Sequence, residues 1–127
     1  MTMNEEIDAA IVSHVQWGLR LKEAIHSGDT KFAVEDVLRD DVCVFGKWLY
    51  GDTIPPPVKS LKEYQEIIAV HARFHKHAAT LVMHVNDGNL EEVKTCLSEN
   101  SDYTTTSLLL VLHLRLWQIY AGNFASL

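Results

Sequence analysis

The chain has 127 residues, the size of one domain, with 47% hydrophobic residues and a formal net charge of −6. It contains only six glycines and three prolines, which favours an ordered globular chain over a disordered one. The negative charge argues against a nucleic-acid partner, because the phosphate backbone attracts basic surfaces. We therefore expect a single domain spanning residues 1–127.

Three features bear on the cellular location. The N-terminal residues, MTMNEEIDAAIV, begin acidic and lack the basic start of a signal peptide. The longest apolar run, SLLLVLHLRLW at 107–117, is too short to span a membrane and contains a histidine and an arginine. Two cysteines, Cys43 and Cys96, are too few for a disulfide framework. These features predict a cytoplasmic protein that makes no membrane contact.

The first third of the chain predicts one long helix and two short ones. A helix is expected over about 4–26, with a stripe at spacings of three and four residues. This stripe comprises Ile7, Ile11, His14, Gly18, Leu21 and Ile25. A short amphipathic segment follows at 32–38, and a second short helix is expected in CVFGKWLYG at 43–51.

The rest of the chain predicts two more long helices. The segment GDTIPPP, 51–57, is expected to be non-helical, because proline lacks the amide hydrogen that a helix uses. The next helix is expected from Val58 or Ser60 to about Val85. Its stripe comprises Leu61, Tyr64, Ile68, His71, His75, Ala78, Val82 and Val85.

The last helix is expected from about Asn89 to Ala121, with SDYTTTS at 101–107 marking a kink or break. We find no convincing strand pattern. The sequence therefore predicts an all-α protein, a four-helix bundle with an additional short helix that carries Cys43.

Polar residues on the apolar stripes indicate a metal site. His71 and His75 lie one helical turn apart in HARFH, and His14 lies near the middle of the first helix, at a similar height. An HxxxH pair alone is a weak signal in a chain with seven histidines. Cys43 begins a short helix, whose N-terminal amides favour the thiolate that binds metals. A small buried apolar residue is an equally good interpretation of Cys43.

Three motifs in order resemble the chemoreceptor zinc-binding (CZB) domain family. They are HVQW at 14–17, CVFGKWL at 43–49 and HARFH at 71–75, and the second is the most specific. The resemblance covers about 7–85 and implies one zinc per chain, held by His14, Cys43, His71 and His75.

The resemblance also implies a regulatory, non-enzymatic function. Members of the family control chemoreceptors or diguanylate cyclases, and thus chemotaxis or cyclic-di-GMP, in response to zinc or to oxidants such as hypochlorous acid. Many are homodimers. The chain contains no visible effector region, so we expect a standalone module or a fragment whose effector acts in trans or has been lost.

The surroundings of the site and three alternatives complete the prediction. We assign Trp17, Phe45, Trp48 and Phe74 to an apolar shell around the ligands. Glu63 and Glu66 are candidate partners for an imidazole N–H, although the solvated surface is the better interpretation of both.

The alternatives are a di-iron or other metal-binding bundle with carrier or enzymatic activity, a catalytic zinc site, and a structural bundle whose histidines are satisfied by hydrogen bonds. No HxxxE or HxxxD pair, typical of a di-iron site, occurs in the chain.

Overall fold

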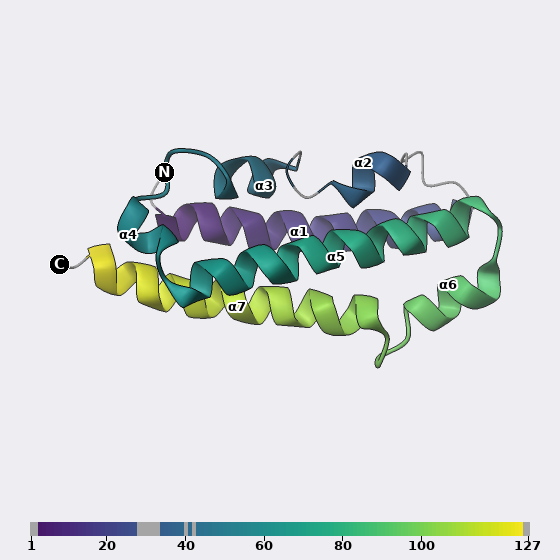
Figure 1. Cartoon of the computed structure of the whole chain (residues 1–127). Helices are drawn as coiled ribbons and strands as arrows, with labels where there is room; N and C mark the ends of the chain where they lie inside the picture. The colour runs from purple at the N-terminus through teal and green to yellow at the C-terminus, as the bar shows by residue number, and fades with distance from the viewer. Residues whose placement is uncertain (1–2, 28–33, 40, 42, 126–127) are drawn as a thin grey trace.

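The structure is a computed structural model that describes residues 3–27, 34–39, 41 and 43–125. These residues form seven helices and no strand (Figure 1). The helices are α1 (Met3–Ser27), α2 (Val34–Leu38), α3 (Val44–Leu49), α4 (Pro56–Lys59), α5 (Lys62–Asn86), α6 (Leu90–Cys96) and α7 (Asp102–Ala125). The prediction of an all-α helical bundle is confirmed.

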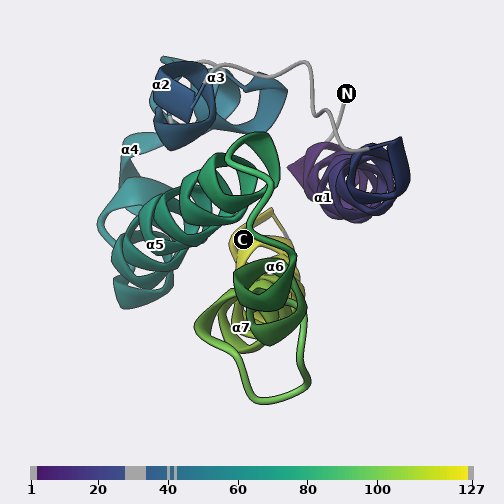
Figure 2. The ribbon, with the colours of Figure 1, turned by 90° about the vertical axis from the view of Figure 1, so that its right-hand side faces the viewer.

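Three long helices, α1, α5 and α7, run lengthwise through the molecule (Figure 1). Seen end-on, α5 lies between α7 on one side and the short helices α2 and α3 on the other (Figure 2). Helix α1 lies beside this stack and packs mainly against α7. Short helices thus take the place of a fourth long helix.

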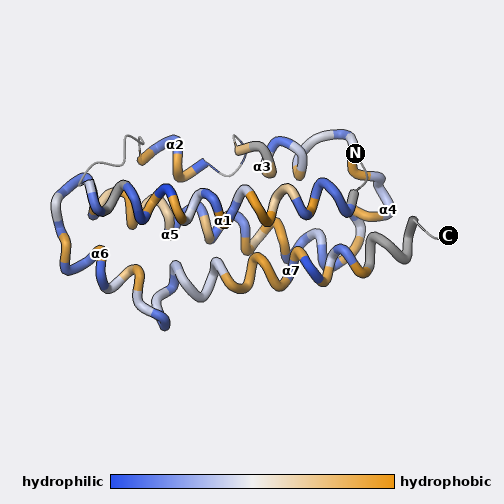
Figure 3. Tube along the Cα trace, turned by 180° about the vertical axis from the view of Figure 1, so that it is seen from behind, coloured by the Kyte–Doolittle hydropathy of each residue, from blue (hydrophilic) through white to orange (hydrophobic). Residues whose placement is uncertain are grey.

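The core forms where the predicted stripes meet. Ile7 and Leu21 of α1 and Ile67 and Leu81 of α5 are fully buried, and Trp117 of α7 belongs to the same core. Hydrophobic and hydrophilic residues alternate along the long helices, as a one-sided core requires (Figure 3). Across the described ranges, no helix combines the length and apolar character needed to cross a lipid bilayer.

The prediction for the proline run is wrong at its end. Pro56 and Pro57 open helix α4, and Pro55 precedes it as the N-cap. The first turn of a helix has no internal acceptor for its N–H groups, so proline is tolerated there. The long helix α5 begins only at Lys62, after a turn at Ser60 and Leu61.

The last predicted helix is divided in two. The chain leaves α6 after Cys96 and enters α7 at Asp102, so the break precedes the threonines rather than including them. Ser101 explains the boundary, because its Oγ accepts a hydrogen bond from the backbone N–H of Thr104 at 3.1 Å. A serine that caps the first turn allows poor helix formers to continue as helix.

Candidate metal centre

Cys43 is held at the start of α3. It is the N-cap residue, with an extended backbone, and its Sγ accepts the backbone N–H of Gly46 at 3.2 Å. A thiol or thiolate can replace the usual oxygen acceptor at this position. The cap therefore fixes the direction in which the sulfur points.

Helix α5 presents His71 and His75 to that sulfur. Their Nε2 atoms lie 3.0 Å apart, as expected for residues one turn apart on the same face. The Sγ of Cys43 lies 3.5 Å from Nε2 of His71 and 3.6 Å from Nε2 of His75. Both histidines are buried, with 3% and 9% of their surface exposed. Cys43, His71 and His75, which we call the Cys–His–His group, place all three donor atoms within 4.8 Å of one another.

The donor atoms fit a zinc ion. A tetrahedral site, with zinc at about 2.0–2.1 Å from nitrogen and about 2.3 Å from sulfur, needs about 3.6 Å between sulfur and nitrogen and about 3.3 Å between two nitrogens. The two sulfur–nitrogen distances of the Cys–His–His group agree with this requirement, and its nitrogen–nitrogen distance is slightly shorter. One thiol and two imidazoles are also ligands that zinc prefers.

A backbone carbonyl orients His75. Its Nδ1 lies 2.8 Å from the carbonyl oxygen of Val37 in α2. A carbonyl oxygen can only accept, so Nδ1 carries the hydrogen and Nε2 presents a lone pair to the group. This arrangement is typical of metal-binding histidines. Sequence reasoning missed Val37, because every residue has a carbonyl and none is marked in the sequence.

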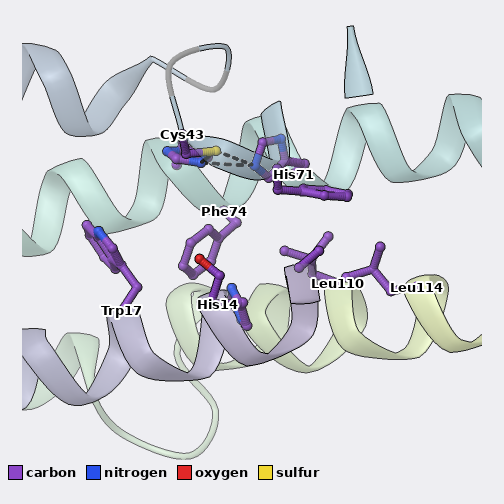
Figure 4. Close-up of a pocket in the computed structure, with 11 residues that line it drawn as sticks. His14, Trp17, Cys43, His71, Phe74, Leu110 and Leu114 are labelled. Carbon is purple, nitrogen blue, oxygen red and sulfur yellow. Dashed lines mark hydrogen bonds between the residues drawn. The ribbon is translucent and has the colours of Figure 1, made fainter. Parts of the chain in front are cut away.

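Aromatic side chains enclose the group, as predicted. Phe45 meets the ring of His71 edge to face at 5.0 Å, and Phe74 meets that of His75 at 5.7 Å. Trp17 packs on Phe74, while Trp48 lies one layer further out, against Phe45 and Trp117. A small cavity of about 60 Å³ lies beside the group (Figure 4). Its lining includes Ala10, Ser13, His14, Leu110 and Leu114 besides the group, Trp17 and the two phenylalanines.

The structure does not bring His14 into the Cys–His–His group. Its Nε2 lies 2.7 Å from the Oγ of Ser107 in α7, and its ring packs edge-on against Phe74 at 4.3 Å. Figure 4 shows Phe74 between His14 and Cys43. Burial, together with a smaller effect of nearby His75, lowers the pKa of His14 to about 4, so the ring is neutral at neutral pH. His14 nevertheless lines the same cavity as the group.

Neither candidate carboxylate contacts an imidazole of the group among the interactions of the described residues. Oε2 of Glu66 lies 3.4 Å from Nδ1 of His113 in α7, and Oε1 lies 3.7 Å from Nζ of Lys62. Glu63 is half-buried on α5. The surface interpretation of these residues is therefore closer to the structure than a role beside the ligands.

A half-buried thiol and two buried imidazoles on a helical bundle define a helical protein with a candidate metal centre. The family model described as the chemoreceptor zinc-binding domain (CZB) matches residues 14–82, more than half of the chain. The chain belongs to this family. The matched segment begins at His14 and includes Cys43, His71 and His75. Comparisons with curated proteins and with solved structures found no match.

Proposed function

We propose that the chain is a regulatory module that binds one zinc ion through Cys43, His71 and His75, with His14 as the fourth ligand. The observation that carries this proposal is the Cys–His–His group, whose three donor atoms meet at near-tetrahedral distances beside aromatic side chains. Four protein ligands leave no position for a water molecule, which favours regulation over hydrolysis. When bound, zinc would hold the cysteine as thiolate and tie together the helices that carry its ligands.

Regulation would act through the position of α3. Helix α3 has only six residues, and α5 provides the two histidines that contact its N-cap residue, Cys43. Losing the metal would remove the strongest link between these two helices. The proposal places the protein in a reducing compartment such as the cytoplasm, where Cys43 and Cys96 stay reduced.

Oxidation of Cys43 would be a second signal for the module, besides the loss of zinc. Hypochlorous acid would oxidise its thiolate by two electrons to sulfenic acid and would itself be reduced to chloride. A sulfenic acid is a poorer zinc ligand than a thiolate, so oxidation would release α3 as zinc removal does. We propose a chemoreceptor, the protein class that the family description names, as the regulated effector, with a diguanylate cyclase as the other candidate.

The module is proposed to act as a homodimer. Seven large apolar residues are exposed on two neighbouring helices, and we call this surface the α1–α7 apolar face. It comprises Val12, Val15 and Leu19 of α1 and Leu108, Leu112, Leu116 and Ile119 of α7. Most of them are more than half exposed, with Leu108 the highest at 67%. Exposed apolar side chains gathered on two neighbouring helices typically mark an interaction site.

Charge favours a second copy as the occupant of this face. Asp8, Val12, Val15, Leu19 and Lys22 follow one another along α1 at spacings of four and three residues, so they form one stripe. A two-fold axis near Val15 would pair the stripe with itself, antiparallel. Asp8, which also pairs with Arg115 of α7 at 2.9 Å, would then lie opposite Lys22 of the partner subunit, and the apolar residues would meet between them.

Metal analysis of the purified chain tests the zinc proposal. We expect about one zinc per chain, with a sharp loss in Cys43→Ala and His71→Ala. His77→Ala, a half-buried histidine on the same helix outside the group, is the matched control and should retain the metal. Two irons per chain would favour the di-iron alternative. A chain that takes up no metal under any condition would contradict the proposal.

A further inference from the structure

His14 has a specific partner outside the Cys–His–His group. Its Nε2 is joined to the Oγ of Ser107 at 2.7 Å, and both residues are half-buried. This hydrogen bond connects α1 to α7 across 93 residues of sequence. The nitrogen in this hydrogen bond is the one farther from the backbone, so it has the longer reach of the two ring nitrogens.

The reach of Nε2 of His14 matters because of the way α1 packs in the fold. Helix α1 packs mainly against α7 and touches α5 and α3 at few points. A ligand from α1 must therefore extend across the cavity that His14 lines to meet a metal held by the group. The two histidines of the group also point Nε2 at the shared centre. Since Nε2 has one hydrogen or one lone pair, it cannot bind Ser107 and a metal together.

We propose that Ser107 competes with the metal for Nε2 of His14 and thereby sets the zinc affinity of the centre. This inference rests on the proposed function, since it needs a zinc ion that draws on His14. The hydrogen bond to Ser107 holds the ring of His14 toward α7. Metal binding would turn the ring toward the group, and the freed hydroxyl would donate to the carbonyl oxygen one turn earlier in α7, as serines within helices do.

Replacing the hydrogen bond of His14 to Ser107 by a bond to the metal would also affect the surface of the protein. His14 and Ser107 line a groove between α1 and α7 together with Val15, Leu19 and Leu108 of the α1–α7 apolar face. Breaking the hydrogen bond removes a link between the two helices directly below that face. The proposed dimer surface would thus respond to metal binding.

Zinc affinity, measured with the full chain by competition against a chromogenic chelator, tests the exchange. Ser107→Ala removes the competitor, so zinc should bind about two- to tenfold more tightly, the value of one net hydrogen bond. The unfolding midpoint of the metal-free variant should fall at the same time. Ser107→Thr keeps the hydroxyl and should bind zinc as the wild type does. Thr105→Ala, an exposed threonine on the same helix, is the matched control and should leave the affinity unchanged.

A double-mutant cycle isolates His14 as the site of competition. In a His14→Ala background, adding Ser107→Ala should leave the zinc affinity unchanged, because the imidazole for which Ser107 and the metal compete is then missing. Unchanged or weaker binding by Ser107→Ala alone would overturn the inference, as would an equal gain in the His14→Ala background. If the wild-type chain binds no zinc, the proposed function fails and the inference with it. Normal wild-type binding without a gain in Ser107→Ala overturns the inference alone.

Discussion

The Nδ1 of His75 donates a hydrogen bond to the carbonyl oxygen of Val37 at 2.8 Å. This bond joins the candidate metal centre to α2, a helix of five residues that contributes no ligand. It also holds the ring of His75 with Nε2 toward Cys43. The orientation of one ligand therefore depends on how firmly α2 packs on α5, and the side chain of Val37, 6% exposed, provides that packing.

Val37→Ala should weaken both the fold and the centre. Removing two buried methyl groups should lower the free energy of unfolding by about 1–2 kcal/mol. Loosening the carbonyl that orients His75 should reduce zinc affinity by about tenfold. Denaturant unfolding and chelator competition measure the two effects. Glu35→Ala, an exposed residue of the same helix, is the control. If both variants bind zinc equally well, Val37 has no orienting role.

Cys43→Ser should keep the fold and lose the response to oxidant. A serine hydroxyl can accept the N–H of Gly46 as the sulfur does, so the cap of α3 is preserved. Serine is a poor zinc ligand, so metal binding should fall sharply. The release of zinc on titration with hypochlorous acid measures the response. Cys96→Ser should respond as the wild type does, and a full response that survives in Cys43→Ser would exclude Cys43 as the redox element.

Val15→Cys should form a disulfide between two copies of the chain. In the proposed dimer, residue 15 lies near the two-fold axis, so the two sulfurs approach each other. The cross-link is measured on a non-reducing gel after mild oxidation of the zinc-loaded chain in a Cys96→Ser background. Thr80→Cys, on the exposed side of α5, is the control and should remain monomeric on the gel. Equal cross-linking of the two variants would contradict this interface.

Two glycines should respond in opposite directions to alanine. Gly88, in the turn after α5, has a φ of 71°, which side chains avoid, so Gly88→Ala should destabilise the fold by about 1–2 kcal/mol. Gly18 lies within α1, where an added Cβ would meet only the Oη of Tyr103, at 3.7 Å. Gly18→Ala should therefore stabilise the fold by about 0.5–1 kcal/mol. Thermal unfolding compares them, and a change of the same sign in both would contradict this explanation.

Features set by local rules could be predicted from the sequence. His71 and His75 share a face because the pitch of a helix repeats wherever a helix forms. Cys43 could be placed at the start of a short helix from CVFGKWL, and the family motifs connected it with the histidines. The helix boundaries at Pro56 and Asp102 were harder to predict, because capping and local propensity compete there by small amounts of free energy.

The long-range contacts depend on how the helices pack. That the sulfur of Cys43 meets two nitrogens on α5 follows from the placement of α3, which no local pattern encodes. The carbonyl of Val37 could not be recognised at all, because it is chemically the same as every other carbonyl in the chain. The hydrogen bond of His14 to Ser107 arises because α1 packs on α7 rather than closely on α5. The spacing of residues along the chain thus predicts which side chains can be ligands, while the packing of the helices determines which of them meet.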